Sequence, residues 1–534
     1  ICRAELAEAF QISISKVRII SPLQGGGFGG KGGLTAEPIA VALALKTNGK
    51  PVKLAYTREE EFVSTMVRHP TKIDIKTGVK KDGTLWARQV KGVWDTGAFA
   101  EKGPTVCSRG TLSASGPYRI PHLCLDGYCV YTNNPIAGAF RGFSAPQITW
   151  AYESQMDIIA AELKMDPLEI RLKNVFVSGD TSQTGQVLKA VGVKECLERT
   201  ADRIGWFKRK KSENRGMGIA CMHKWQGVYS SSALLKVDGD GSIILSVGTM
   251  EIGTGCNTIL SQIVVEELGV PIENIKIAAR DTDYTPYDTS TTASRSTFMM
   301  GNAVMRAAKD AKEQLLNLAC HVMVSNRDTL VMEAGEVFAR SAPNRRLTWS
   351  ELAQKSLSSP QGPVIGRGVY VVSPKAFDIE TGQGWAPPWM YAAQAAEVEV
   401  DTETGIVKVI RISAAHDIGK AINPSLCEGQ IEGALITGLG ASLWEEVLLK
   451  EGRFLNPNFR DYKLSTALDI PEIYPILVEE SHEDGPYGAK GLGEPALAPT
   501  AAAIANAVCD AVGIRIKDLP LTPEKVLRAL KGKK

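Results

Sequence analysis

The apolar positions of the chain follow two different periods. Short runs rich in β-branched residues predict strands, and longer runs in which apolar residues recur about every three to four positions predict helices. The strand-like runs are Val17–Ile20, Val52–Tyr56, Ile73–Ile75, Ala233–Val237, Ile243–Val247 and Val407–Ile412. The helix-like runs are Ile148–Glu162, Thr258–Leu268, Asn302–Leu318, Gly429–Leu443 and Ala498–Val512. Their alternation predicts an α+β fold (mixed α/β) with several sheets.

Chain length and one polar segment predict the division into domains. A chain of 534 residues exceeds what a single hydrophobic core serves, so several domains are expected. The segment Trp206–Arg215, WFKRKKSENR, is rich in Lys and Arg and has little apolar content. We therefore predict a first domain at 1–205, a basic linker at 206–215 and a second domain at 216–534. A localisation signal or phosphate site is the less favoured interpretation of the linker.

The balance of charge argues against nucleic acid or a membrane surface as a partner. Lys and Arg number 61 against 59 Asp and Glu, so the net charge of +2 creates no strong field. Purely apolar stretches fall short of the roughly 20 residues of a membrane span. The ten cysteines are scattered, without a C-x-x-C pair, so we expect a cytoplasmic protein with reduced thiols and no cluster of its own. Because the sequence opens on Ile1 rather than Met, we expect further residues upstream.

A glycine-rich segment follows the first strand-like run. Gln24–Gly33 reads QGGGFGGKGG, and glycine lets main-chain N–H groups come within hydrogen-bonding distance of a ligand. Gly25–Gly30 also fits the dinucleotide pattern G-x-G-x-x-G, so an NAD-dependent dehydrogenase is an open alternative. A P-loop fits less well, because Gly32 stands where Ser or Thr must bind magnesium.

Further loops rich in glycine and in hydroxyl or amide side chains lie downstream. They are Ala139–Gln147 (AFRGFSAPQ), Gly248–Asn257 (GTMEIGTGCN), Thr289–Ser296 (TSTTASRS) and Lys490–Pro495 (KGLGEP). A single nucleotide needs one such loop, whereas a bulky polar cofactor buried between domains needs donors from several sides. Together with QGGGFGGK, HDIGKAINP and GQIEGA, these loops occur in the order found in the molybdopterin-binding large subunit of xanthine dehydrogenase and aldehyde oxidase enzymes. The chain resembles that family along nearly its whole length.

The resemblance implies a multi-domain molybdopterin-binding fold and a molybdenum hydroxylase that takes its oxygen from water. It implies a molybdopterin cofactor, with or without an added cytosine dinucleotide, and molybdenum with oxo and sulfido ligands. In the family the pterin dithiolene holds the metal, which is consistent with six histidines that show no metal-ligand spacing. Electrons are expected to pass to an iron–sulfur subunit with [2Fe-2S] clusters and to an FAD subunit. The active protein is also expected to need the remaining N-terminal segment of the domain, which carries a glutamine that contacts a molybdenum ligand.

The resemblance assigns the catalytic role to Glu494, which matches a glutamate that faces the molybdenum in the G-x-G-E-P loop of the family. A carboxylate there can accept the proton of a metal-bound hydroxyl and so create a nucleophile for an electron-poor carbon. The alternative is that Glu494 only complements the N-terminus of the helix-like run 498–512.

The resemblance also implies a set of cofactor contacts. They are Gly27, Phe28, Gly29, Ala139, Phe140, Arg141, Gly253, Thr254, Ser294, Ser296, Gln430 and Gly493. For Arg141 the alternative is an ordinary buried ion pair, and for the serines it is a turn whose hydroxyls bond only one another. Thr254 stands where many relatives carry Gln, so one contact is expected to be lost or replaced by water.

Substrate-binding residues are implied by the resemblance at two positions. Arg109, nine residues before Tyr118, matches an arginine that orients substrate in xanthine dehydrogenases, and Phe143 matches an aromatic residue that packs on purines. Core packing is the alternative for Phe143. Gly32 replaces the acidic residue that those enzymes use to polarise purine. We favour an N-heteroaromatic substrate, purine- or nicotinate-like, over an aldehyde, and a structural scaffold is the non-enzyme alternative.

Overall fold

The computed structural model describes residues 1–209, 212–372, 378, 381–384 and 387–532. The chain forms two compact units that interleave along the sequence. Unit 1 comprises Ile1–Gly27, Gly227–Pro374 and Glu483–Gly491, and unit 2 comprises Phe28–Gln226, Lys375–His482 and Leu492–Lys534. Both units combine helices with sheets, which confirms the predicted α+β class.

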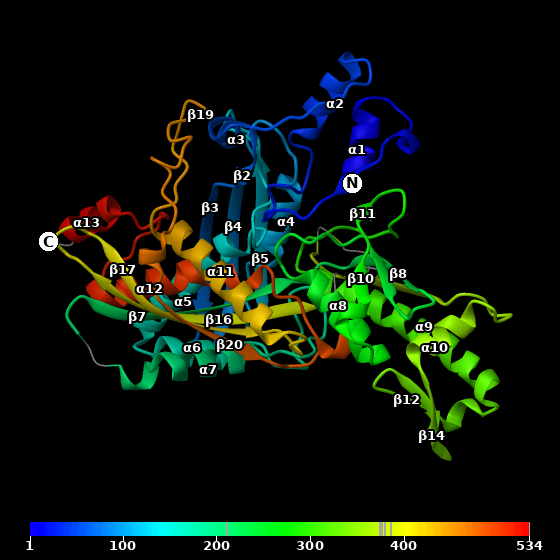
Figure 1. Ribbon diagram of the computed structural model, residues 1–534. Coiled ribbons are helices and arrows are strands. Elements are labelled where there is room, and N and C mark those ends of the chain that lie inside the picture. Colours follow the sequence, from blue (N-terminus) through cyan, green and yellow to red (C-terminus); the bar gives the residue numbers. More distant parts are fainter. Residues whose placement is uncertain (210–211, 373–377, 379–380, 385–386, 533–534) are drawn as a thin grey trace. The chain divides into compact units, whose positions relative to one another are not determined.

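Unit 1 is built on a four-stranded sheet with the strand order β10–β9–β8–β15. Helix α9 lies along β15 and β8, and α8 packs beside α9 (Figure 1). A smaller antiparallel sheet, β12–β13–β14, is followed by α10. The elements are α1 (Cys2–Ala9), β1 (Ile20–Ser21), β8 (Tyr229–Val237), β9 (Ile243–Val247), α8 (Cys256–Leu268), β10 (Ile275–Ile277), β11 (Arg280–Asp281), α9 (Gly301–Met323), β12 (Leu330–Glu333), β13 (Glu336–Ala339), β14 (Ala342–Thr348), α10 (Trp349–Ser356) and β15 (Ile365–Val372).

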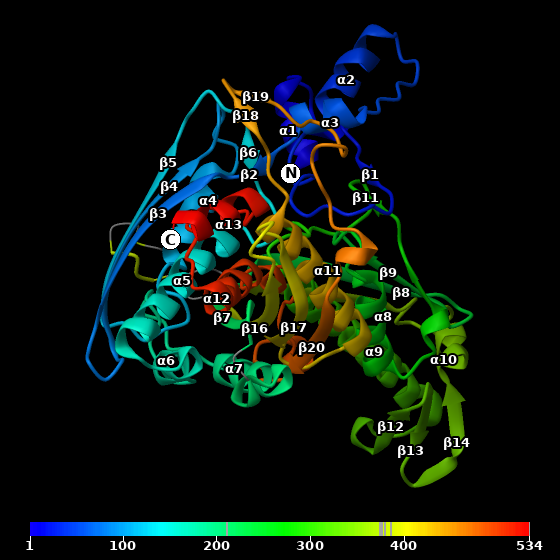
Figure 2. The ribbon, with the colours of Figure 1, turned by 90° about the vertical axis from the view of Figure 1, so that its left-hand side faces the viewer.

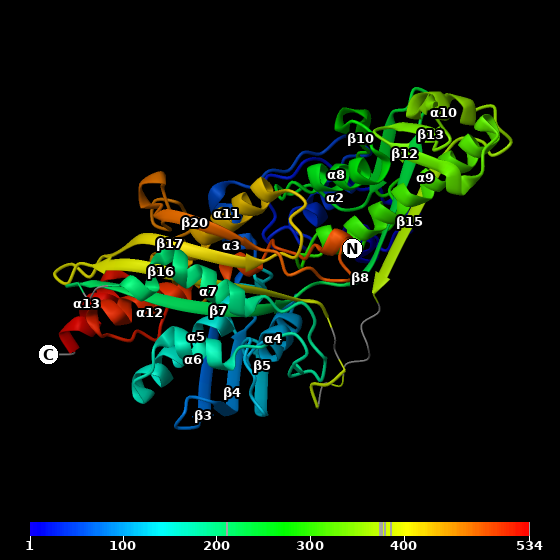
Figure 3. The same ribbon diagram turned by 90° about the horizontal axis from the view of Figure 1, so that it is seen from below.

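Unit 2 has a four-stranded sheet in the order β20–β17–β16–β7, and these strands lie side by side in Figure 3. Its strands are β7 (Arg215–Trp225), β16 (Trp389–Val400), β17 (Val407–Asp417) and β20 (Glu472–Val478). Helix α7 (Val193–Ile204) packs on β16 and β17, and α12 (Thr500–Val512) packs on β7 and β16. A three-stranded sheet, β3–β4–β5, is covered by α4 and α5, as Figure 2 shows.

The remaining elements of unit 2 connect and flank these sheets. They are α2 (Glu37–Lys46), α3 (Arg58–Ser64), β2 (Val67–Arg68), β3 (Thr71–Val79), β4 (Leu85–Asp95), α4 (Gly103–Leu112), β5 (His122–Val130), β6 (Ala137–Gly138), α5 (Ala145–Leu163), α6 (Pro167–Asn174), α11 (Pro424–Leu443), β18 (Leu449–Lys450), β19 (Arg453–Phe454) and α13 (Pro523–Gly532). The short strands β2 and β6 pair in parallel, which brings the chain before β3 next to the AFRGF loop that follows β6.

Close packing of α12 on β7 depends on small residues. A Cβ at Gly218 would lie 2.2 Å from the backbone nitrogen of Ala507, so only glycine fits there. The helix is correspondingly rich in alanine. The segment Pro495–Val512 is also apolar and long enough, at 18 residues, to pass a test for a membrane span, but 72% of it is buried inside the structure. Its contacts with the sheet make it a core helix of unit 2.

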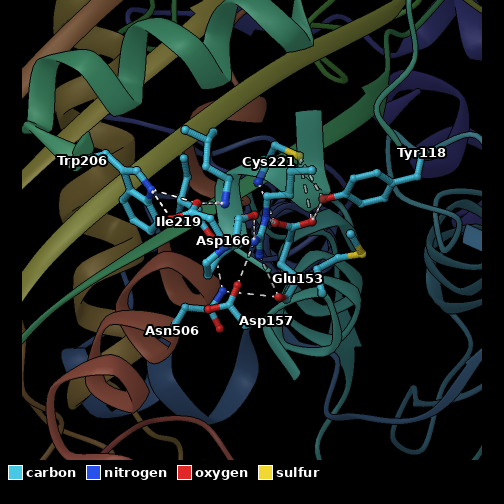
Figure 4. A network of polar contacts seen from close by, with 12 residues as sticks. Tyr118, Glu153, Asp157, Asp166, Trp206, Ile219, Cys221 and Asn506 are labelled. Carbon is cyan, nitrogen blue, oxygen red and sulfur yellow. Dashed lines mark hydrogen bonds and ion pairs between the residues drawn. The ribbon is translucent and has the colours of Figure 1, made fainter. Parts of the chain in front are cut away.

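A buried polar network joins β7 to the helices of unit 2 (Figure 4). Glu153 of α5 accepts hydrogen bonds from Arg171 Nε of α6 at 2.7 Å, from the backbone N–H of Cys221 at 2.9 Å and from the hydroxyl of Tyr118. The side chains of Glu153 and Arg171 are fully buried, and Arg171 also pairs with Asp157 at 2.8 Å. A buried carboxylate needs such a set of donors, because an unpaired charge in the interior is costly.

Most of the predicted elements are confirmed. Four helix-like runs lie within α5, α8, α9 and α11, and Ala498–Val512 begins two residues before α12 and ends with it. Four strand-like runs lie within β3, β8, β9 and β17. Two predicted strands are wrong. Only Ile20 of the run Val17–Ile20 belongs to a strand, and Val52–Tyr56 pairs with no other described segment. A β-branched run becomes a strand only where a partner edge is available, and sequence alone does not show that edge.

The described part of the predicted basic linker is anchored rather than solvated at its start. Trp206 is buried, and its indole N–H donates to Asp166 at 3.1 Å. Arg209 pairs with the same carboxylate at 2.7 Å and stacks over the Trp206 ring. The reason is the large apolar indole at the head of the segment, whose burial outweighs the polarity of its neighbours. Residues 206–215 lie inside unit 2, and residues 210–211 of the predicted linker lie outside the described residues.

The buried ion pair yields a prediction about stability. Glu153→Gln removes one carboxylate from Arg171 and leaves it with Asp157 in the core, so we expect the free energy of unfolding to fall by about 1–3 kcal/mol. Urea denaturation followed by circular dichroism measures this loss. The matched control is Glu195→Gln, because Glu195 pairs with Arg199 at 3.2 Å while both side chains are about half exposed. That variant should lose less than about 1 kcal/mol, and equal losses in the two variants would contradict the role of the buried pair.

Candidate active site

Arg141 joins three of the predicted cofactor segments in unit 2. Its Nε donates to the carbonyl oxygen of Gly493 at 2.7 Å, and its Nη2 donates to the backbone oxygen of Gln430 at 3.1 Å and to the side-chain oxygen of Gln430 at 3.3 Å. The guanidinium carbon also lies 5.8 Å from the centre of the Phe28 ring. No carboxylate of the described residues lies within ion-pair distance of Arg141, so the ion-pair alternative is wrong.

Glu494 faces a buried lysine. Lys224 Nζ at the end of β7 donates to Glu494 Oε2 at 2.8 Å, and the two side chains are 1% and 15% exposed. Glu494 stands at the N-cap position of the 3-10 turn Pro495–Leu497, but its side chain makes no capping hydrogen bond. The carboxylate is therefore engaged by a cation rather than by a helix terminus, which argues against the capping alternative.

Two further cations act on Glu494 from other segments. Arg141 and Arg68 of β2 both interact electrostatically with the carboxylate. Burial lowers the pKa of Arg141 to about 10 and that of Arg68 to about 10, while Glu494 opposes both shifts. Both guanidinium groups thus stay charged near neutral pH. Arg68 Nη2 donates to the backbone oxygen of Arg141 at 3.0 Å, and its guanidinium stacks 4.3 Å from the centre of the Phe140 ring.

The predicted substrate residues meet at Trp225, the residue after Lys224. The guanidinium carbon of Arg109 lies 5.2 Å from the centre of the Trp225 ring, and the Phe143 ring meets Trp225 edge-on at 6.2 Å. Phe143 also packs against the buried residues Trp94, Val106 and Cys107, so the core-packing alternative describes part of its environment. The structure thus brings Arg109 and Phe143 together around one aromatic ring.

The glycine loop approaches the AFRGF loop within unit 2. Gly29 has a φ of +110°, and a Cβ on it would lie 2.2 Å from the carbonyl oxygen of Ala139. Phe28 has a positive φ of 50° and a side chain that is 54% exposed. Only glycine at position 29 permits this approach of the two main chains. Among the described residues, no hydrogen bond uses the backbone N–H of Gly26, Gly27 or Phe28.

The other predicted cofactor residues belong to unit 1, where charged side chains shape their loops. Glu251 accepts hydrogen bonds from the backbone N–H groups of Gly253, Gly255 and Asn257 at 2.9, 3.0 and 3.0 Å. Burial acts to raise the pKa of Glu251, but these hydrogen bonds outweigh it and the pKa lies below its usual value. The carboxylate thereby fixes the turn that contains Gly253 and Thr254. The backbone of the same residue contacts the glycine-rich segment, because the N–H of Gln24 donates to the carbonyl oxygen of Glu251 at 3.2 Å.

The TTASRS loop of unit 1 is anchored by a buried arginine. Arg295 pairs with Asp288 at 2.6 Å and also donates to the backbone oxygen of Ser230 at 2.8 Å. Ser294 has a positive φ of 54°, and Ser296 begins the π-turn that leads into α9. Strained backbone of this kind persists where surrounding contacts determine it. Ser290 and Thr292 hydrogen-bond each other at 2.7 Å, which shows that self-bonded hydroxyls occur in this loop.

The donor set of unit 2 fits a polar cofactor better than a metal held by side chains. His416 is fully buried near Arg141, and neither ring nitrogen hydrogen-bonds to a described residue. Burial, reinforced by Arg141, lowers the pKa of His416 to about 3, so the imidazole is neutral. Within the described ranges no group of three or more His, Cys, Asp or Glu side chains could hold a metal ion. Within unit 2, the unused N–H group of Phe28 and the fixed Arg141 are suited to bind an anionic or carbonyl-bearing group.

Comparison with known proteins identifies the family. Models described as molybdopterin cofactor-binding domains match residues 1–175 and 186–471. The xanthine dehydrogenase molybdenum-binding subunit of Escherichia coli O157:H7 is 36% identical over 543 residues, which cover 98% of this chain and 71% of that protein. The chain belongs to the xanthine dehydrogenase family. As a member of this family it is a molybdenum-dependent oxidoreductase with molybdopterin-binding domains, as its motifs predicted.

Relatives within the family have different substrates in their names. The nicotine 6-hydroxylase large subunit of Paenarthrobacter nicotinovorans is 29% identical over 549 residues, 97% of this chain and 66% of that protein. The crystal structure of quinoline 2-oxidoreductase from Pseudomonas putida 86 matches with a TM-score of 0.90 at 25% identity, over 99% of this chain and 70% of that one. The xanthine dehydrogenase-type fold therefore extends through nearly the whole chain.

Sequence reasoning missed the side chains that position the predicted segments within each unit. Lys224 and Trp225 end β7, and Glu251 and Arg295 fix two loops of unit 1. A lone lysine in the otherwise apolar run that ends at Trp225 was the available signal, because a lysine in a buried strand requires a partner. Nothing in the sequence shows which carboxylate that partner is.

The approach of the two loops at Gly29 can be tested by one added methyl group. Gly29→Ala places a Cβ against the Ala139 carbonyl in a left-handed backbone, so we expect a destabilisation of about 1–3 kcal/mol and a loss of bound molybdenum. Thermal melting and elemental analysis of the purified holoenzyme measure the two effects. Gly433→Ala in α11 is the control, because nothing lies within 4 Å of the added Cβ. If both variants lose metal equally, the loop contact does not shape the cofactor site.

Proposed function

We propose that this chain forms the molybdenum site of a hydroxylase that oxidises an electron-poor N-heteroaromatic compound, purine- or nicotinate-like, with water as the oxygen source. The observation that supports this proposal is the end of β7, where Lys224 pairs with the carboxylate of Glu494 and the next residue, Trp225, contacts Arg109 and Phe143. The names of the relatives support the substrate class, because xanthine, nicotine and quinoline are all N-heteroaromatic compounds.

Different residues of unit 2 have different roles in such a reaction. When bound, the molybdopterin cofactor supplies a metal that activates water and accepts the two electrons of the oxidation. Glu494 accepts a proton from the attacking water, and its ion pair with Lys224 holds the carboxylate in place. Arg109 donates hydrogen bonds to a carbonyl or carboxylate group of the substrate, and the edges of Phe143 and Trp225 pack on its ring.

Cofactor binding is assigned to two sets of residues. In unit 2 the proposed contacts are Phe28, Gly29, Ala139, Phe140, Arg141, Gln430 and Gly493, several of which hydrogen-bond one another through Arg141. In unit 1 they are Gly27, Gly253, Thr254, Ser294 and Ser296, whose loops Glu251 and Arg295 hold. The division into domains at 1–205 and 216–534 belongs to the same proposal.

The finer identity of the cofactor and partners is also proposed. The molybdenum would carry oxo and sulfido ligands, and the pterin would carry a cytosine dinucleotide or none. Two electrons per turnover have to leave the site, and the cysteines of this sequence show no cluster-type spacing. We therefore assign [2Fe-2S] clusters and FAD to partner subunits and place the complex in the cytoplasm. Several relatives are subunits by name, which supports a multi-subunit enzyme.

Glu494→Gln tests the general base. The amide keeps the shape and a hydrogen-bond acceptor for Lys224 but cannot take up a proton, so kcat should fall on the order of a hundred- to ten-thousandfold. Molybdenum content and KM should change little. Steady-state kinetics on an N-heteroaromatic substrate, with the metal determined in the same preparation, measure this. Glu446→Gln is the control, since Glu446 forms an ion pair with Lys525 outside the candidate site. A nearly normal kcat in Glu494→Gln would remove the proposed function of this carboxylate.

Arg109→Met tests the substrate class. The variant loses the donors for a carbonyl or carboxylate group, so kcat/KM for a substituted heterocycle should fall by about tenfold or more, as expected when a charged hydrogen bond is lost. An aldehyde does not need that contact, and its kcat/KM should stay within a few fold of the wild-type value. The measurement is the ratio of kcat/KM for the heterocycle to kcat/KM for the aldehyde, in the variant and in the wild type. Equal losses on both substrates would favour a structural role for Arg109, and wild-type activity on the aldehyde alone would favour an aldehyde oxidoreductase.

A further inference from the structure

Strand β7 is apolar and buried along most of its length, yet it carries Lys224 at its end. The side chain of Lys224 is 1% exposed, and its Nζ is positioned by three groups. It donates to Glu494 Oε2 at 2.8 Å and to the backbone oxygen of Trp225 at 3.3 Å, and it lies 4.3 Å from the centre of the Trp225 ring. A buried ammonium with all of these contacts has little freedom to move.

Stability alone is a weak explanation for this lysine. Replacing a buried ion pair with apolar side chains is often neutral or stabilising, because the desolvation of two charges offsets their attraction. A methionine at position 224 of β7 would pack in unit 2 equally well. The ion pair therefore points to a role in what Glu494 does. Arg141 and Arg68 do not replace Lys224 here, because their hydrogen bonds go to main-chain and amide oxygens and they act on Glu494 from a longer distance.

We propose that Lys224 is a positioning residue for the general base: it holds Glu494 Oε2 so that the carboxylate keeps one orientation during turnover. This inference rests on the proposed function of Glu494. Among the cations that act on the carboxylate are Lys224 from β7, Arg68 from β2 and Arg141 from the loop after β6, and Lys224 Nζ donates to it directly at 2.8 Å. Because Trp225 follows Lys224, the same strand end also sets the distance between the base and the ring beside Arg109.

A double-mutant cycle on the holoenzyme tests this role. The four proteins are the wild type, Lys224→Met, Glu494→Gln and the double variant, each purified with its partner subunits and with its molybdenum content measured. Lys224→Met should lower kcat by about ten- to a hundredfold, the loss expected for a hydrogen bond to a charged group, with KM changed much less. In the Glu494→Gln background the same substitution should change kcat by less than about threefold, because Lys224 then has no base to position. Lys525→Met removes the lysine of another ion pair and should leave kcat unchanged.

Thermal melting gives a readout that does not depend on activity. Glu494→Gln leaves the ammonium of Lys224 buried without a counter-ion in contact, so the melting temperature should fall. Adding Lys224→Met to that variant should restore part of the loss. If Lys224→Met does not accumulate as folded protein, Lys224→Gln, which keeps a donor without the charge, takes its place in the cycle and should show a smaller loss of kcat.

The outcomes separate the two proposals. Losses of kcat that multiply in the double variant, or a Lys224→Met enzyme with normal kcat, would overturn the positioning role while leaving Glu494 as the base. A Glu494→Gln enzyme with normal kcat would overturn the proposed function of Glu494 itself. In that case the melting data would still show whether the two side chains are coupled. Non-additive losses of kcat together with partial recovery of the melting temperature support both.

Discussion

The carboxylate of Glu153 cannot remain buried without donors, and the way unit 2 supplies them fixes β7. Arg171 arrives from α6, Tyr118 from the chain that follows α4, and the backbone N–H of Cys221 from β7 itself. A shift of β7 by one residue would withdraw that N–H and turn every side chain of the strand to the opposite face. Lys224 and Trp225 follow Cys221 on the same strand, so the register set at Glu153 determines where they emerge. The position of the base and of the substrate residues thus depends on a structural ion pair in the core.

The two buried cations Lys224 and Arg141 differ in their hydrogen-bond partners. Lys224 meets a carboxylate directly, whereas Arg141 directs its hydrogen bonds to oxygens of Gly493 and Gln430 and keeps its positive charge uncompensated by any described carboxylate in contact. Glu494 acts on this buried guanidinium only from a longer distance, so an anionic ligand in contact would stabilise its charge further. This imbalance favours an anionic group next to the glycine loop, in agreement with a phosphate-bearing pterin. The proposed general base, Glu494, and the proposed cofactor contact, Arg141, therefore have different hydrogen-bond partners.

The sequence predicted the elements of this fold where local pattern decides them. Ile243–Val247 matches β9 residue for residue, and the long amphipathic or apolar runs all became helices, because their period is a property of the segment itself. The loop motifs likewise identified the family, whereas the role of Glu494 stays a prediction. The strand predicted at Val52–Tyr56 is wrong because a strand also needs a partner edge. The solvated linker is wrong at Trp206, because the indole is buried and donates to the carboxylate of Asp166. These failures share one cause: the deciding contact lies far away in the sequence.

The same cause explains why half of the candidate site was missed. Lys224 and Glu494 are separated by 270 positions, and Arg141 and Gly493 by 352, so no local pattern links them. A motif can show that Glu494 stands where relatives place a catalytic glutamate, but it cannot show what holds the carboxylate. Each compact unit is also assembled from three separated segments, so a division of the chain at one point does not separate one unit from the other. Residues that act on the substrate can be recognised by resemblance, whereas residues that act through another side chain become visible only when the fold brings the two together.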